Sequence, residues 1–139
     1  MILGIGTDIC DITRIEEMIE KFGQRFLDKT FTSHEQSYCE PKSSKGSSYA
    51  KRFAAKEAVA KALATTHSGA LSWTDVEVKN DPSGRPRVTL HGGALQRLNA
   101  KTPDGHEARV YLSLSDDYPY ATAYAITVSY THLTLPTKA

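Results

Sequence analysis

One helical stretch constrains this fold more than any other part of the chain, because it is apolar on two sides. The stretch RFAAKEAVAKAL spans residues 52–63, and helical geometry spaces its side chains by about 100° each. One face consists of small or branched apolar residues: Ala55, Ala58, Val59, Ala62 and Leu63. The opposite side carries Phe53, Ala60 and Ala64, with Glu57 among them. A helix that is apolar on two sides is normally buried on both, so the expected helix from about Tyr49 to Ala64 should be covered on both.

The rest of the chain places helices early and strands late. Gly4 and Gly6 in the first strand suggest close backbone approach rather than a dinucleotide fingerprint. Periodicity predicts a strand over residues 2–9 and a helix over residues 11–26. A helix start at Thr32–Glu35 then predicts a short helix over residues 32–41. Four strands and another short helix are expected later: strands 76–79, 86–91, 108–115 and 120–128, and helix 92–101. This order predicts a single α+β domain, an antiparallel sheet with packed helices, over residues 1–128. The tail 129–139 has no assignable pattern.

Composition narrows the possible functions. The chain has 139 residues and a formal net charge of +1, which gives no general attraction to nucleic acid. No apolar run is long enough for a membrane span, and the N-terminus does not resemble a signal peptide. The two cysteines, Cys10 and Cys39, lack the spacing of a zinc or redox motif. We therefore expect a cytoplasmic protein with no nucleic-acid or membrane partner, and burial by oligomerisation is plausible for a core of this size.

Glu57 has two readings. It can form an i,i+4 pair with Lys61 on an exposed face, which would contribute a few tenths of a kcal/mol. It can also be a metal ligand in a cleft, because burying a carboxylate is costly unless a cation or hydrogen bonds satisfy it.

Asp8 is the natural second carboxylate for a metal site. It ends an apolar strand, although strand-end solvation or a helix N-cap would also explain it. Magnesium usually takes one or two carboxylates together with waters and substrate phosphates. Nearby cations could meet such phosphates. These cations are Arg14, Lys42, Lys45, Arg52, Lys56 and Lys61.

Several motifs together resemble one family. GIGTDICDITRIE near the N-terminus and KRFAAKEAVAKAL in the helix resemble the bacterial holo-[acyl-carrier-protein] synthases, the small phosphopantetheinyl transferases. NDPSGRPRVTLHG and the late pair VYLSLSDD and YATAYAI resemble the same family in the same order. The resemblance implies the phosphopantetheinyl transferase fold, a magnesium ion, and a homotrimer with active sites at its subunit interfaces. It also implies transfer of the 4′-phosphopantetheine arm of coenzyme A to a serine of apo acyl carrier protein, releasing adenosine 3′,5′-bisphosphate and supporting fatty acid biosynthesis.

The resemblance assigns roles to residues. Asp8 and Glu57 correspond to the metal ligands, and with Lys61 they form the expected catalytic group. The expected coenzyme contacts combine the helix motif, the Gly-x-Pro turn and the basic loop: Arg52, Phe53, Lys56, Lys61, Gly84, Arg85, Pro86, Lys42 and Lys45. The first helix of the family docks the carrier protein, which gives five expected partner contacts: Arg14, Met18, Lys21, Arg25 and Phe26. The base for the serine is either Glu57 or a metal-bound water.

Two departures from the family pattern stand out. Members commonly carry Gly-Thr-Gly after the helix, whereas this chain reads TTHSG over 65–69, so we expect extra side chains to crowd the coenzyme or shift the loop. Asp116 stands where many members place a histidine at the coenzyme 3′-phosphate. Two other functions remain open: a magnesium-dependent phosphohydrolase that uses water as its nucleophile, and a carrier-binding module without catalysis.

Overall fold

The computed structural model describes residues 1–65, 67 and 71–131 of the chain. In the first half, strand β1 (Ile2–Asp11) leads into four helices: α1 (Ile12–Phe22), α2 (Gln24–Thr30), α3 (Ser33–Cys39) and α4 (Lys45–Ala62). A 3-10 turn and two strands follow: η1 (Trp73–Asp75), β2 (Val76–Asn80) and β3 (Pro86–Leu90). The described chain then continues through α5 (Gly92–Lys101), β4 (His106–Asp117) and β5 (Tyr120–Thr131). The predicted α+β class is confirmed.

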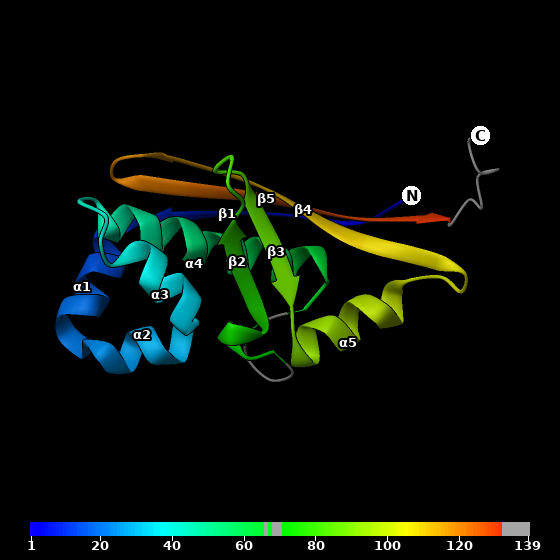
Figure 1. Cartoon of the computed structure of the whole chain (residues 1–139), viewed down its shortest axis with the longest axis horizontal. Coiled ribbons are helices and arrows are strands. Elements are labelled where there is room, and N and C mark those ends of the chain that lie inside the picture. The colour runs from blue at the N-terminus through cyan, green and yellow to red at the C-terminus, as the bar shows by residue number, and fades with distance from the viewer. Residues whose placement is uncertain (66, 68–70, 132–139) are drawn as a thin grey trace.

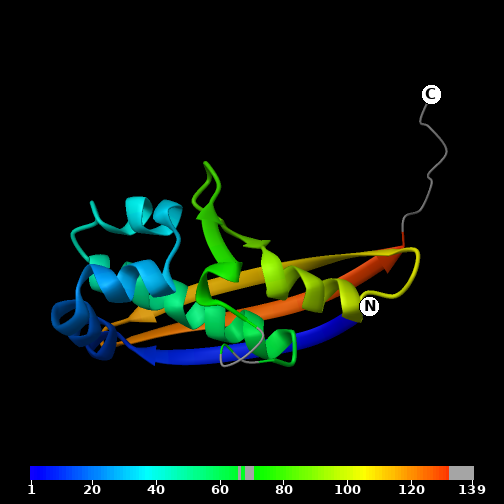
Figure 2. The same ribbon diagram turned by 90° about the horizontal axis from the view of Figure 1, so that it is seen from below.

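The strands form two antiparallel sheets. A three-stranded sheet has the order β1-β5-β4, and β2 and β3 form a separate two-stranded sheet. The N-terminal strand therefore pairs with the last one, and Gly6 lies opposite Ala125. Figure 1 and Figure 2 show α4 lying along one face of the three-stranded sheet, with α1 to α3 at one end and α5 near the other.

Helix α4 packs unusually close to strand β1. A Cβ atom built on Gly6 would lie 1.9 Å from the carbonyl oxygen of Ala58, and one on Gly4 would lie 2.0 Å from that of Ala62. Only hydrogen atoms at these two positions allow the strand to approach the helix backbone. The predicted role of both glycines is confirmed. Ala55, Ala58, Val59 and the rest of the apolar stripe are buried in the core, as expected. On the opposite side only Ala60 is buried, whereas Phe53 is half-buried and Ala64 is exposed, so burial on both sides is confirmed in part.

Several element boundaries differ from the sequence expectation. The helix expected over 11–26 is broken at Gly23, whose φ of 58° ends α1 and starts α2. Helix α4 begins at Lys45, four residues before the expected start near Tyr49. Strand β5 continues to Thr131, three residues beyond the expected domain end at 128, because its end pairs with His106 and bonds to Met1. The remaining tail residues, 132–139, lie outside the described residues. The helix start at Thr32 is confirmed as a capping box with Glu35.

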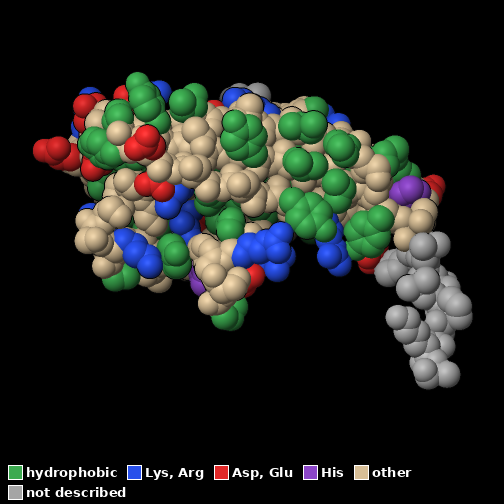
Figure 3. Space-filling model, turned by 90° about the horizontal axis from the view of Figure 1, so that it is seen from above, with side chains coloured by type: hydrophobic (Ala, Val, Ile, Leu, Met, Phe, Trp, Pro, Cys, Tyr) green, Lys and Arg blue, Asp and Glu red, His purple; other side chains and the backbone are tan. Residues whose placement is uncertain are grey.

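The outer face of the three-stranded sheet is not covered by any described helix, and it is apolar. Figure 3 shows hydrophobic side chains gathered along it. Its large exposed residues come from all three strands: Ile5, Ile9, Tyr111, Tyr120, Tyr124 and Ile126. Within the described part of the chain, no helix has the length and apolar character needed to cross a membrane.

Candidate active site

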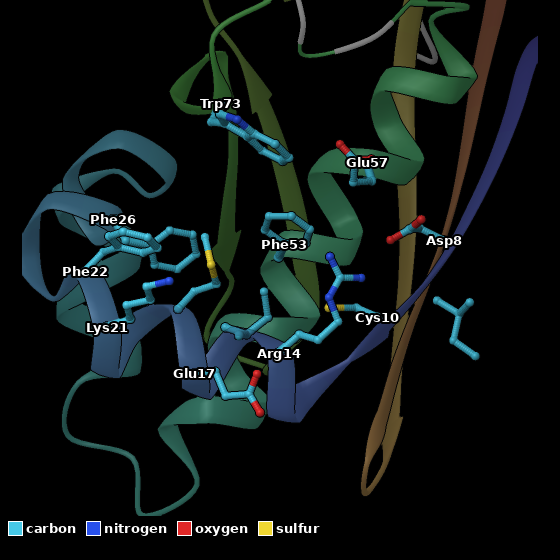
Figure 4. A pocket seen from close by; sticks show the side chains of 13 residues that line it. Asp8, Cys10, Arg14, Glu17, Lys21, Phe22, Phe26, Phe53, Glu57 and Trp73 are labelled. Atoms are coloured by element: carbon cyan, nitrogen blue, oxygen red, sulfur yellow. The ribbon is translucent and has the colours of Figure 1, made fainter.

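The two predicted metal ligands line one cavity of about 510 Å³ between β1, α1 and α4. Asp8 reaches it from strand β1, and Glu57 reaches it from the middle of α4. In Figure 4, Glu57 stands between Asp8 on one side and the rings of Phe53 and Trp73 on the other. The close packing of β1 against α4 therefore brings two carboxylates that are 49 residues apart in sequence to one cavity.

Lys61 completes this group through Asp8. Its ammonium lies 3.2 Å from Oδ1 of Asp8 and donates a 2.8 Å hydrogen bond to the carbonyl of Thr7. Among the described residues, Lys61 thus pairs with Asp8 and not with Glu57, so the surface i,i+4 pair considered from sequence does not form. Asp8 does not cap the first helix either, since Oδ1 of Asp11 accepts the backbone hydrogen bond of Thr13.

The predicted carrier-docking residues border the same cavity. Arg14, Met18, Lys21 and Phe26 line it from α1 and α2, and Met18 is 39% exposed. Next to it lies an apolar depression of about 430 Å³ that Arg25 also lines. The first helix therefore offers a mixed basic and apolar surface at the mouth of the carboxylate cavity.

A second, separate pocket of about 330 Å³ gathers four of the predicted coenzyme contacts: Lys42, Arg52, Gly84 and Pro86. The Arg52 guanidinium lies 4.2 Å from the ring centroid of Tyr38 and donates to the side-chain oxygen of Asn80. Its Nε atom is buried without a hydrogen-bond partner among the described residues. A guanidinium with an unsatisfied donor at a pocket wall is suited to an anionic group.

The other predicted coenzyme contacts lie elsewhere. Phe53 lines the carboxylate cavity, and Arg85 lines a third depression together with Arg87. Lys45 pairs with Glu40 at 3.3 Å on an exposed surface. Lys56 does not reach either pocket, because its side chain is completely buried. The expected coenzyme contact of Lys56 stays a prediction, since its side chain is engaged in the interior of the protomer.

Lys56 belongs to the interior. Its ammonium lies 2.8 Å from Oε1 of Glu35, whose side chain is also fully buried, and it donates to the carbonyls of Trp73 and Val76. Burial lowers the pKa of Lys56 below its usual 10.5, and the Glu35 carboxylate partly offsets this shift. The pair joins α3 and α4 to η1 and β2.

Sequence reasoning missed several residues around these pockets. Trp73 lines the carboxylate cavity beside Phe53, at a ring-centroid distance of 4.7 Å. Cys10 also lines it, and burial, with a smaller contribution from Asp8, raises the pKa of its thiol to about 11. Lys51 lines the second pocket and pairs with Asp116 at 3.0 Å. A second cation directly before Arg52 was the available signal for Lys51, whereas nothing in the sequence tied Trp73 to Phe53.

Three carboxylates line the cavity, those of Asp8, Glu17 and Glu57, and the predicted metal ligands are Asp8 and Glu57. Across the described residues, no group of three or more His, Cys, Asp or Glu side chains is arranged to hold an ion. Two hard oxygen donors are nevertheless compatible with magnesium, which commonly takes one or two carboxylates and completes its shell with waters and substrate phosphates. Carboxylate oxygens are hard donors of the kind that magnesium prefers, whereas structural zinc sites usually use cysteine and histidine.

The comparison with known families identifies the class of protein. The sequence model of the 4′-phosphopantetheinyl transferase superfamily matches residues 4–125. The chain belongs to this family.

Within the family, the relatives share one more specific name. The holo-[acyl-carrier-protein] synthase of Methylorubrum extorquens (strain PA1) is 53% identical over 126 residues, covering 91% of this chain and 93% of the relative. The crystal structure of holo-[acyl-carrier-protein] synthase from Neisseria meningitidis is 35% identical, with a TM-score of 0.80, and the match covers 92% of this chain and 99% of that one. That of the Helicobacter pylori enzyme in complex with coenzyme A is 30% identical, with a TM-score of 0.76, covering 89% and 99%.

Proposed function

We propose that this protein is a holo-[acyl-carrier-protein] synthase. It transfers the 4′-phosphopantetheine arm of coenzyme A to a serine hydroxyl of apo acyl carrier protein and releases adenosine 3′,5′-bisphosphate. The observation that carries this proposal is that Asp8 and Glu57 line one cavity, with Lys61 paired to Asp8 and the proposed docking residues of α1 along the same cavity. Family membership and relatives of this name support it.

Asp8 and Glu57 are the residues that would hold a magnesium ion. When bound, the ion offsets negative charge on the phosphate oxygens of the substrate. The two carboxylates lie on β1 and α4, which pack closely against each other at Gly4 and Gly6. The site is therefore built on rigid structure.

The chain's own residues supply the remaining chemistry. The serine oxygen of the carrier forms a bond to the pantetheine-linked phosphorus while the bond from that phosphorus to the adenosine-side phosphate breaks. Lys61 neutralises charge on the leaving phosphate, which is the main form of catalysis in phosphoryl transfer. Glu57 is the candidate within this cavity to accept the serine proton.

The separation of the two pockets within one protomer supports a homotrimer. In one protomer the metal-ligand candidates lie in the first cavity, whereas Arg52, Gly84 and Pro86 lie in a separate pocket. We propose that neighbouring protomers bring one pocket of each kind together. The uncovered apolar sheet face, with Ile5, Tyr124 and Ile126, supplies the surface for this association. Both cysteines are free, which suits a reducing cytoplasm.

One assay tests the activity. The protein is incubated with coenzyme A and apo acyl carrier protein, with and without magnesium, and the carrier is weighed by mass spectrometry. We expect a mass gain equal to the phosphopantetheine arm only with magnesium. Cleavage of coenzyme A without a carrier would instead indicate a phosphohydrolase, and carrier binding without any mass gain would indicate a non-catalytic module.

A second measurement tests the assembly. Analytical ultracentrifugation should give three times the protomer mass for the unmodified protein and a monomer for Ile126→Asp. Mixing Glu57→Ala with Arg52→Ala protomers should restore part of the transfer activity, because some interfaces then combine one intact half from each. A monomeric unmodified protein with full activity would reject the shared site.

A further inference from the structure

The turn after α4 contributes a buried histidine ring next to the carboxylate cavity. His67 stacks on Trp73 with a ring-centroid distance of 4.0 Å and an interplanar angle of 9°, and Trp73 stacks on Phe53. The His67 side chain is 4% exposed, although it belongs to a connecting segment. Of the other residues of the sequence departure over 65–69, Thr66, Ser68 and Gly69 lie outside the described residues.

One hydrogen bond joins the same ring to the interior. Nε2 of His67 lies 2.9 Å from the carbonyl of Lys56 and donates to it, because a carbonyl oxygen can only accept. The ammonium of Lys56 in turn donates to the carbonyl of Trp73. His67, Lys56 and Trp73 are therefore joined to one another by one ring stack and two hydrogen bonds. Lys56 is also held by its buried ion pair with Glu35.

These three joined residues lie directly against the proposed catalytic group. Nε2 of His67 is 3.8 Å from Oε1 of Glu57, the residue that follows Lys56 in α4. Phe53 and Trp73 line the cavity next to Glu57, and Figure 4 shows both rings on one side of its carboxylate. The ring of His67 therefore occupies the space behind the cavity wall, where it supports Trp73 and limits the positions open to Glu57.

From this geometry the structure assigns His67 a positioning role: its ring holds Trp73 in the cavity wall and keeps Glu57 directed toward the reacting phosphate. The inference rests on the proposed function. Loss of the packed ring should change the geometry of the reacting groups at the carboxylate cavity. The pocket that contains Arg52 is separate, so the binding of coenzyme A there should change less. We therefore expect an effect on kcat rather than on the KM for coenzyme A.

Three substitutions distinguish the contribution of the His67 ring from the contribution of its hydrogen bond. His67→Ala removes both, His67→Phe keeps a ring for the stack, and His67→Gln keeps a donor without a ring. Trp73 is the sole tryptophan of the chain, so its fluorescence and near-ultraviolet circular dichroism report on the stack directly. His34→Ala, at an exposed position on α3, is the matched control.

We expect His67→Ala and His67→Gln to lower kcat about tenfold, with the KM for coenzyme A within about twofold of the unmodified value. Both should change the Trp73 spectra. His67→Phe should restore the spectra and most of kcat, and His34→Ala should change neither. If His67→Ala does not fold, the comparison of His67→Phe with His67→Gln still decides the role.

Two results would overturn the inference. One is an undiminished kcat in the ringless variants. The other is a His67→Gln variant that is fully active while His67→Phe is impaired, since that would give the role to the hydrogen bond. If the unmodified protein transfers nothing, the proposed function fails and the role of His67 fails with it. Transfer by the unmodified protein with an undiminished His67→Ala kcat rejects the role of His67 alone.

Discussion

Lys56 and Glu35 form an ion pair of 2.8 Å in which neither side chain has exposed surface. Glu35 also accepts hydrogen bonds from the backbone of Thr32 and Val78, so its two oxygens are both used. The pair is thus a fully satisfied connection between α3, α4 and β2. Removing one member leaves the other charge buried without its partner, which is much more costly than losing a surface pair.

Lys56→Met should therefore lower the free energy of unfolding by about 3–5 kcal/mol. The double substitution with Glu35→Gln should cost less than the sum of the single ones, because it removes both charges. Urea unfolding followed by circular dichroism measures these values. Lys101→Met on α5 is the control, with an expected change within about 0.5 kcal/mol. A Lys56→Met variant as stable as this control would contradict the finding.

Gly6→Ala should disrupt the contact between strand and central helix. The new methyl group would lie 1.9 Å from the carbonyl oxygen of Ala58, so β1 and α4 must separate. We expect the free energy of unfolding to fall by about 3 kcal/mol, at the upper end for overpacking. Thr7→Ala, at the next and exposed position, should change it by less than about 1 kcal/mol. Equal stability of the two variants would argue against the close packing.

The central helix, the capping box at Thr32 and the late strands could be predicted from sequence, because each follows from local periodicity or a short motif. The sequence could not predict that the side chain of Lys56 points into the interior. The sequence grouped Lys56 and Lys61 together as cations near the candidate site, and only the tertiary structure shows that one faces Glu35 and the other Asp8. These partners are distant in sequence, and choosing between them requires the packing of α3 and β1.

The candidate active site, like the fold, could be predicted from sequence only in part. Asp8 and Glu57 could be paired from chemistry and family resemblance, and both line one cavity. The separation of the Arg52 pocket from that cavity could not be read from sequence, since Arg52 and Glu57 are little more than one helical turn apart. Their different directions on α4 decide which pocket each one reaches.

Glu57→Ala should abolish magnesium-dependent transfer while leaving the fold intact. Glu57 lines the cavity and takes no part in the buried ion pair, so its loss removes a proposed metal ligand without exposing core surface. We expect transfer to fall about a hundredfold or more. The circular dichroism spectrum should not change. Glu20→Ala, an exposed glutamate on α1, serves as the control. Near-normal turnover in Glu57→Ala would reject the site assignment.

Cys10 should react slowly with alkylating reagents in the folded protein. Burial raises the pKa of its thiol from 9.0 to about 11, and the thiolate is the reactive form. At pH 8 the thiolate fraction, and with it the alkylation rate, should be about a hundredfold lower than in the unfolded chain. The rate should keep rising as the pH increases from 9 toward 11. Iodoacetamide labelling followed by mass spectrometry measures this in a Cys39→Ala background, and fast native labelling at pH 8 would contradict it.

Arg14→Glu should weaken recognition of the carrier protein without changing the chemical step. Arg14 lines the mouth of the cavity from α1, and acyl carrier proteins are acidic, so reversing this charge replaces attraction with repulsion. We expect the KM for the carrier to rise about tenfold, with kcat unchanged, which corresponds to roughly 1.4 kcal/mol of lost binding. The increase should shrink at high salt, because the contact is exposed and screened. Lys101→Glu makes the same charge change on α5, away from α1, and should leave the KM unaltered. An unchanged KM with a lower kcat for Arg14→Glu would instead place Arg14 among the catalytic residues.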